Sequence, residues 1–258
     1  MSQLAPVEDV VLLLDVSGSM TERDYPPSRL EAAKAAALEF LHQKLGIDPR
    51  DNVSVVTFAG AANRLCNLLN LDRDRERLEN TIKRISCRAW TGTAIGDGLS
   101  AAGAVLGESR SPIQRIVLLS DGQNNRGRAP QLLAEQLKKA GVIIDTIGIG
   151  DPKVVDEATL KAIASEIDGR LRYRHISSAR ELIRYFAGLS DKVRAHAFAA
   201  VPDAAPEIRF LGPATPRPGA RDVSGEDVQI TLLDSERRPL EETSQEEAVE
   251  IKFMNAEP

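Results

Sequence analysis

The sequence has 258 residues, a formal net charge of −5, 42% hydrophobic side chains and 28% charged ones, which is the composition of a soluble globular protein. We expect neither a membrane span nor a secretory signal. The chain has no apolar run of the roughly 18 residues that a spanning helix needs, and no basic flank followed by an apolar stretch at its start. Two cysteines, Cys66 and Cys87, are too few for a disulfide framework and, with three scattered histidines, for a zinc cluster, so they indicate a reducing, cytoplasmic location. No basic stripe with interleaved aromatic residues is present, which argues against a nucleic-acid partner.

Short apolar runs alternate with longer stretches of helical spacing from residue 8 to about residue 190. The pattern predicts strands and helices of ordinary length: strands at 10–14, 53–58, 113–119, 142–149 and 171–176, and helices at 28–45, 72–85, 93–106, 130–140, 156–167 and 178–189. Such alternation predicts right-handed crossovers and a Rossmann-like, doubly wound α/β fold, with a mostly parallel sheet covered on both faces. A shorter, more polar run at 64–69 follows 53–58 closely, so we expect one antiparallel strand at the sheet edge.

The composition changes near residue 190, which we expect to end a first domain over residues 1–190. Five prolines predict a linker over 191–221. The remaining segment, 222–258, has 11 acidic residues against 3 basic ones and forms an acidic appendage. A small β unit and a partly disordered acidic tail both fit this region, because three stretches are strand-like, 207–211, 228–233 and 249–254.

Oxygen-bearing side chains follow two of the predicted strands and precede one predicted helix. The first strand ends in Asp15-x-Ser17-x-Ser19, where a carboxylate and two hydroxyls at alternate positions suit a tight loop that turns three oxygens toward one point. Asp121 ends the third strand, and Thr93 lies just before a helix. The carboxyl ends of parallel strands share one edge of the sheet, so we expect these side chains to meet there. Carboxylate and hydroxyl oxygens are hard ligands, which predicts a site for Mg²⁺ or Mn²⁺ without choosing between them.

The charge of these ligands favours binding over catalysis. Two carboxylates balance a divalent cation, and an octahedral ion would keep water positions open for one further carboxylate from outside. We therefore expect a protein-interaction module that receives an Asp or Glu from a partner protein, and we expect no enzyme. The alternative is a metal-dependent phosphohydrolase, which would need a nucleophile or base beside the metal, and none can be assigned.

The five residues Asp15, Ser17, Ser19, Thr93 and Asp121 resemble the metal-ion-dependent adhesion site of von Willebrand factor type A domains. The resemblance covers about three quarters of the chain and implies a Rossmann-like sheet with one antiparallel edge strand. It also implies that Ser17, Ser19 and Thr93 bind the metal directly or through water. The two aspartates would act mostly through water or hydrogen bonds.

Five further segments resemble the bacterial Bat-type branch of this family: Pro27-x-Arg29-Leu30, Val56-x-Phe58-Ala59-Gly60, Gly92-Thr93-Ala94-Ile95-Gly96-Asp97, Asp121-Gly122-x-Asn124-Asn125 and Thr146-Ile147-Gly148-Ile149-Gly150. Members of that branch often carry membrane segments and work beside MoxR-type AAA+ ATPases. Because we expect no membrane segment in this chain, it would be a soluble relative. The resemblance implies that its partner is a AAA+ ATPase or another member of a multiprotein system.

Some features near the proposed centre have two interpretations each. Trp90 either lines a ligand surface or packs the loop at its rim. Arg126 and Arg128 either steer an acidic partner toward the site or belong to a solvated loop. The acidic appendage is a candidate for regulation, because one of its carboxylates would block the ion against partners.

Overall fold

The computed structural model of the chain describes residues 5–87 and 92–192. Their elements are, in chain order, β1 (Glu8–Asp15), the 3-10 turn η1 (Gly18–Thr21), α1 (Arg29–Ile47), β2 (Asn52–Phe58), β3 (Ala62–Arg64), β4 (Leu69–Asn70), α2 (Arg75–Lys83), α3 (Ile95–Leu106), β5 (Ile113–Ser120), α4 (Pro130–Lys139), β6 (Ile143–Ile149), α5 (Glu157–Ile163), β7 (Glu166–Ile167), β8 (Arg170–Leu171), β9 (Tyr173–Ile176) and α6 (Ala179–Leu189). The predicted linker beyond residue 192, the acidic appendage and Trp90 lie outside the described residues. Within the described ranges, no helix is both long and apolar enough to cross a membrane.

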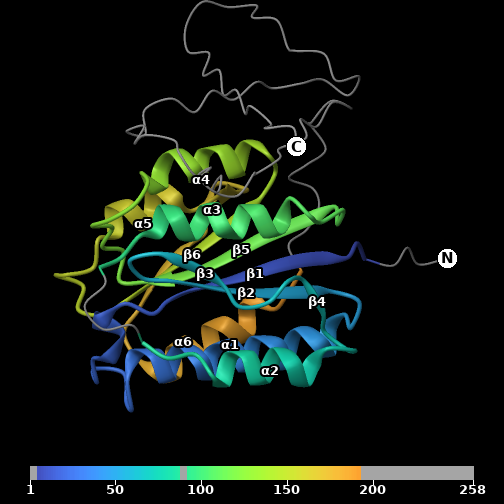
Figure 1. Ribbon diagram of the computed structural model, residues 1–258, viewed down its shortest axis with the longest axis horizontal. Coiled ribbons are helices and arrows are strands. Elements are labelled where there is room, and N and C mark those ends of the chain that lie inside the picture. Colours follow the sequence, from blue (N-terminus) through green and yellow to red (C-terminus); the bar gives the residue numbers. More distant parts are fainter. Residues whose placement is uncertain (1–4, 88–91, 193–258) are drawn as a thin grey trace, which may run out of the picture. The chain divides into compact units, whose positions relative to one another are not determined.

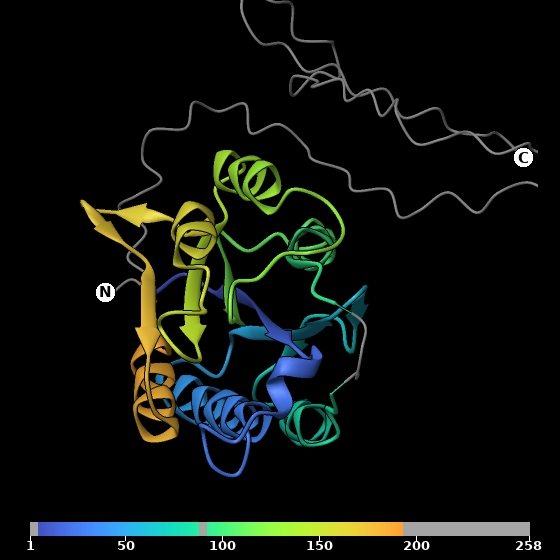
Figure 2. The same cartoon turned by 90° about the vertical axis from the view of Figure 1, so that its left-hand side faces the viewer.

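The main sheet has the strand order β3-β2-β1-β5-β6-β9, and β4 also pairs with β2 (Figure 1 and Figure 2). Strand β1 lies parallel between β2 and β5, with Leu12 opposite Val55 on one side and Val117 on the other. All residues of β1 are buried, because helices cover both of its faces. The structure confirms the predicted doubly wound α/β fold with a mostly parallel sheet.

The predicted antiparallel edge is present in two pieces, β3 and β4, both paired with β2. The chain between them carries Cys66, whose thiol takes the place of a backbone acceptor: the Val55 N–H donates to Cys66 Sγ at 3.3 Å. The Ser54 hydroxyl donates to the Cys66 carbonyl at 2.7 Å. These side-chain hydrogen bonds replace ladder pairs, so the run at 64–69 does not form one continuous strand.

Helices α1, α2 and α6 cover one face of the sheet, and α3, α4 and α5 cover the other (Figure 1). Helix α1 is capped by Ser28, whose hydroxyl accepts a hydrogen bond from the Glu31 N–H at 3.2 Å. On its buried side, the ring of Phe40 meets Phe186 of α6 edge to face, with centroids 6.5 Å apart. The cap fixes where α1 begins, and the ring contact packs α1 against α6.

Helix α5 is shorter than the predicted helix at 156–167, which was wrong at its carboxyl end. The helix stops at Ile163, and β7 and β8 form a separate two-stranded antiparallel hairpin. The turn between them is Asp168-Gly169, with φ of +52° and +71°. Two adjacent residues with positive φ are the geometry of a type I′ hairpin turn, which Asp-Gly favours strongly. That dipeptide was the local signal that the helical spacing obscured.

A network of buried charges lies at the amino end of the sheet, opposite the carboxyl ends of its parallel strands. The Lys44 ammonium pairs with Glu8 and lies 3.0 Å from Asp51 Oδ2. Arg115 Nε lies 2.6 Å from Asp145 Oδ2, and Arg115 Nη1 lies 3.5 Å from Glu8 Oε1. All five side chains are at most 1% exposed. Buried charges require such partners, because an isolated charge in the core is very costly.

The same end of the molecule fastens the last described residues to the sheet. Lys192 Nζ lies 2.5 Å from Asp48 Oδ2 and 3.0 Å from Asp51 Oδ1, and it also donates to the Pro6 carbonyl at 2.6 Å. The Arg50 guanidinium, joined by the Lys192 ammonium and opposed by burial, holds the pKa of the Asp48 carboxyl well below its usual range. These contacts tie the residues after α6 to the start of β1.

Candidate metal centre

Strands β1 and β5 are parallel neighbours, so their carboxyl ends lie side by side. Leu14 is opposite Leu119, and the next residues along the two strands are Asp15 and Ser120. Ser120 Oγ donates to Asp15 Oδ2 at 2.7 Å, and Asp121 follows directly after Ser120. The structure therefore places Asp15 and Asp121 at adjacent strand ends of one sheet edge, where ligand crevices of open α/β sheets form.

Asp15 is fully buried and accepts two hydrogen bonds. Besides Ser120 Oγ, the Ser17 N–H donates to Asp15 Oδ1 at 2.8 Å. Burial, followed by the nearby Asp121 carboxylate, raises the pKa of Asp15 to about 6, although both hydrogen bonds act in the opposite direction. Within the described residues no ion pair reaches Asp15, so this edge holds negative charge that a cation would neutralise.

Ser19 lies on the 3-10 turn that follows β1, and Ser17 is the residue just before that turn. Their Oγ atoms are 3.1 Å apart, and the Ser17 hydroxyl makes no capping hydrogen bond to the turn. The Ser17 carbonyl instead accepts from the Met20 N–H at 3.1 Å, which closes the turn through the backbone. Ser17 is buried and Ser19 is half-buried. The two hydroxyls therefore lie together beside Asp15, and the Ser17 hydroxyl is not used to cap the 3-10 turn.

Thr93 lies on the loop before α3, and two asparagines after Asp121 fasten that loop. The Thr93 N–H donates to Asn125 Oδ1 at 2.9 Å, and the Asn125 N–H donates back to the Thr93 carbonyl at 3.0 Å. Asn124 Oδ1 accepts from the Ile95 N–H at 2.8 Å and so caps α3, because Ala94 at the helix start has no capping group. Thr93 is thereby tied to the same loop that carries Asp121.

Asp121 is buried, and the backbone around it is closely packed. Its carboxylate accepts from the Gln123 N–H at 3.3 Å, and its carbonyl accepts from the Asp156 N–H at 3.1 Å. Gly122 has φ of +80°, and a Cβ atom there would lie 2.7 Å from the Asp156 carbonyl oxygen. Only glycine meets both conditions without strain, so this position helps to set the direction of Asp121.

Arg29, which we had not predicted as a site residue, is the buried cation closest to these carboxylates among the described ion pairs. Its Nη1 lies 4.0 Å from Asp121 Oδ2, and its Nη2 lies 2.7 Å from both Asp24 Oδ2 and Glu22 Oε2. Burial opposes the charged guanidinium, but hydrogen bonding to Asp24 and the nearby carboxylates raise the pKa of Arg29. The guanidinium also packs at Gly150, where a Cβ atom would lie 3.0 Å from Arg29 Cζ. Sequence spacing gave no sign of this contact, because four strands, β2 to β5, lie between Arg29 and Asp121 in the chain.

Two arginines on the loop after Asp121 are exposed at the rim. The Arg126 N–H donates to the Thr93 carbonyl at 3.1 Å, and its side chain lies against Gly92. Arg128 Nε lies 4.0 Å from Asp97 Oδ1 and is largely solvated. Their exposure fits a solvated loop as well as groups that steer an acidic partner.

The chemistry of these donors fits a hard divalent cation. Within the described residues no group of three or more His, Cys, Asp or Glu side chains is placed to hold a metal, so a cation here would use hydroxyl as well as carboxylate oxygens. The buried, unpaired carboxylate of Asp15 beside two serine hydroxyls is such a donor set. Oxygen ligands of this kind suit Mg²⁺ and Mn²⁺.

Comparison with known proteins agrees with this architecture. Residues 10–123 match the family model described as von Willebrand factor type A domain. A UPF0353 protein of Mycobacterium tuberculosis is 31% identical over 208 residues, which cover 71% of this chain and 60% of that protein. The chain thus spans 60% of the length of the curated relatives it matches.

Two solved structures share the fold. The BatB protein of Bacteroides thetaiotaomicron is 22% identical with a TM-score of 0.60, over 70% of this chain and 96% of that one. Proximal thread matrix protein 1 from the mussel byssus, with a zinc-occupied MIDAS motif, is 24% identical with a TM-score of 0.61, over 72% of this chain and 45% of that one.

Proposed function

We propose that the chain carries a von Willebrand factor type A domain, the family whose model matches residues 10–123, and that it binds a partner protein through a divalent cation at the carboxyl edge of its sheet. Ser17, Ser19 and Thr93 would hold the ion directly or through water, and Asp15 and Asp121 would orient its water ligands. A bound Mg²⁺ or Mn²⁺ would supply an electrophilic position for an Asp or Glu oxygen from the partner.

The observation that supports this proposal most strongly is the cradle around Asp15. Its buried carboxylate is oriented by the Ser17 N–H and by Ser120 Oγ, and the Ser17 and Ser19 hydroxyls lie 3.1 Å apart next to it. A buried carboxylate without a cationic partner is expensive, so the fold retains it at a cost in stability that a bound cation would remove.

Neighbouring residues of this chain would hold the proposed ligands in position. Arg29 holds Asp121 from the side of α1 and offsets part of its charge. Asn125 holds the Thr93 loop through reciprocal backbone contacts. These residues keep the oxygens in place before any ion arrives, which lowers the cost of ordering them on binding.

A finer proposal concerns the partner. The sequence resemblance to Bat-type members leads us to propose a MoxR-type AAA+ ATPase as the partner, in the cytoplasm, with this chain acting as an adaptor. Magnesium or manganese is our preferred ion because the proposed ligands are all oxygens, whereas zinc occupies the motif in the mussel protein.

Metal titration of the full chain tests the proposal. Calorimetry with Mg²⁺, Mn²⁺ and Zn²⁺ should show one site, and an ion at 100 times its dissociation constant should stabilise the fold by about 2.7 kcal/mol. The isosteric Asp15→Asn variant and Thr93→Ala should lose this stabilisation. The matched control Asp72→Asn removes an exposed carboxylate and should keep it.

The partner arm uses a purified MoxR-type ATPase from the same genome and an acidic peptide. Binding that requires the ion and disappears in chelator and in Asp15→Asn supports the mechanism. Undiminished binding by Asp15→Asn in chelator would show that the cation has no part in recognition. Absence of any metal binding by the parent chain would refute the proposed centre itself.

A further inference from the structure

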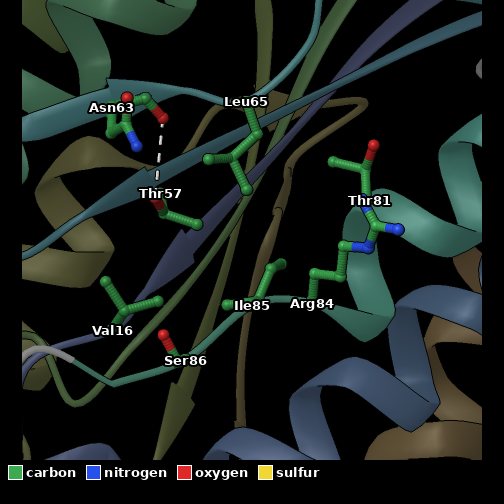
Figure 3. A pocket seen from close by; sticks show the side chains of 8 residues that line it. All are labelled: Val16, Thr57, Asn63, Leu65, Thr81, Arg84, Ile85 and Ser86. Carbon is green, nitrogen blue, oxygen red and sulfur yellow. Dashed lines mark hydrogen bonds between the residues drawn. The ribbon is translucent and has the colours of Figure 1, made fainter.

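A cavity of about 340 Å³ lies between the end of α2 and strands β2 and β3 (Figure 3). Thr57 and Asn63 lie on the strand side, and Arg84 and Thr81 come from the end of α2 across from them. Val16 closes one end and Ser86 lies near it (Figure 3). The volume is at the lower end of the range for ligand sites, and it is sufficient for one side chain of a docked segment.

This cavity lies one strand away from the proposed metal centre, on the same edge of the sheet. Val16 follows Asp15 directly, and its N–H donates to the Phe58 carbonyl at 2.8 Å. Thr57 on β2 is opposite Leu14 on β1, one residue before Asp15. The cavity is therefore lined by the residue that follows Asp15 and by the strand that pairs with β1.

The charge and polarity of the cavity favour a carboxylate. Arg84 is the one charged residue that lines it, and within the described residues no carboxylate lies within ion-pair distance of this guanidinium. The neighbouring Lys83, by contrast, is paired with Glu79 at 2.9 Å. The hydroxyls of Thr57 and Thr81 already donate to the carbonyls of Asn63 and Arg77, at 3.5 Å and 2.8 Å, so the polar group of the cavity that can take a carboxylate is the exposed Arg84 guanidinium, with Ser86 nearby.

The remaining walls match the stem of an acidic side chain. Val16, Leu65 and Ile85 supply apolar surface, and the first and last of these are almost fully buried. An apolar wall with a single guanidinium suits the methylene stem and carboxylate head of Asp or Glu. A neutral apolar side chain would remove water from the Arg84 guanidinium without giving it a partner, which is unfavourable.

We propose that this cavity is a second carboxylate subsite, so that the partner segment is recognised by two acidic residues, one at the ion and one beside Arg84. The proposal rests on the proposed metal-dependent function. In an extended segment, side chains two residues apart lie on one side of the chain and are separated by about 6.6 Å. An acidic-x-acidic motif is therefore the shortest that presents two carboxylates on one side, and we expect this motif in the partner.

Short peptides and the full chain with Mg²⁺ test this proposal. The probe is acetyl-Gly-Asp-Ser-Glu-Gly-amide, and its affinity is compared by calorimetry with peptides in which one acid becomes the matching amide or leucine. Replacing the Arg84 charge in Arg84→Gln should weaken the diacidic peptide roughly ten- to hundredfold, as for the loss of a charge-assisted hydrogen bond. The control Arg73→Gln removes the same charge just before the other end of α2 and should change nothing.

The outcomes separate this subsite from the metal-dependent function. Equal affinity of Arg84→Gln and the parent chain, with binding still lost in chelator, overturns the subsite and leaves the metal site standing. Weaker binding by Arg84→Gln together with full binding in chelator overturns the metal-dependent function, and with it the two-point recognition proposed here.

Three further results would also overturn the subsite. A leucine peptide that binds as well as the diacidic one would show that the cavity is not selective for a carboxylate. Free glutarate that binds in an Arg84-dependent manner as tightly as the peptide would identify a small anion, not a protein segment, as the occupant. Failure of the diacidic peptide to bind at millimolar concentration with Mg²⁺ would exclude the motif.

Discussion

Arg115 provides the most demanding test of how this domain is held together. Its guanidinium is 1% exposed and lies 2.6 Å from Asp145 Oδ2 and 3.5 Å from Glu8 Oε1. Arg115 Nη1 also donates to the Leu189 carbonyl at the end of α6, at 2.7 Å. The substitution Arg115→Met leaves a shorter, unbranched apolar side chain and removes the charge and these hydrogen bonds.

The expected loss follows from what the substitution leaves behind. Glu8 retains Lys44, and Asp145 retains Arg172, whose Nε lies 2.7 Å from Asp145 Oδ1 and is partly exposed. Breaking a buried pair by removing one partner costs about 3–5 kcal/mol, and the remaining cations place this case toward the lower value. The lost hydrogen bond to α6 adds about 1 kcal/mol. We therefore expect a loss of about 4 kcal/mol, which corresponds to roughly 8–16 °C in melting temperature for a domain of this size.

Guanidinium chloride unfolding followed by circular dichroism measures this loss. The control is Arg174→Met, which removes an exposed ion pair with Glu181 at 3.4 Å and should cost at most about 1 kcal/mol. Metal binding should be unchanged in both variants, because Arg115 lies at the opposite end of the sheet from Asp15. A loss below about 1 kcal/mol for Arg115→Met would refute the argument that these charges depend on each other in the core.

Three further predictions concern the surroundings of the metal centre and the amino end of the sheet. Gly122→Ala should cost about 1–3 kcal/mol and abolish metal stabilisation, because its φ is +80°. Gly46→Ala, with nothing within 4 Å of its Cβ, should instead gain about 0.5–1 kcal/mol. Equal melting temperatures for the two glycine variants would contradict this. Arg29→Met should lower the free energy of unfolding by about 3 kcal/mol. In thermal melts, Mg²⁺ should raise the stability of this variant by more than it raises that of the parent chain. A smaller increase in the variant would show that Arg29 does not offset the charge of the site. Asp48→Asn should lower stability at neutral pH, and its difference from the parent should shrink as pH falls below about 4, because the folded-state pKa of Asp48 is depressed. If urea unfolding shows the same difference in free energy of unfolding between Asp48→Asn and the parent from pH 7 to pH 3, the ion pairs of Asp48 do not stabilise the fold.

The sequence alone determined the class of the fold and the candidate ligands. Apolar runs such as 113–119 mark strands buried on both faces, because burial depends on the side chains of the strand itself. Asp15 and Asp121 come directly after two such runs, and the carboxyl ends of parallel strands share an edge. Both inferences use only local pattern and chain order.

Tertiary structure decided which distant groups meet these residues. Arg29 reaches Asp121, Asn125 holds Thr93, and Arg84 faces a cavity beside Val16, and each contact depends on strand order and on how the loops are packed. Hydrophobic periodicity records whether a side chain is buried, but it carries no information about which buried neighbour it meets. The Cys66 thiol that divides the edge strand is another such case, since its acceptor role appears only once β2 lies beside it.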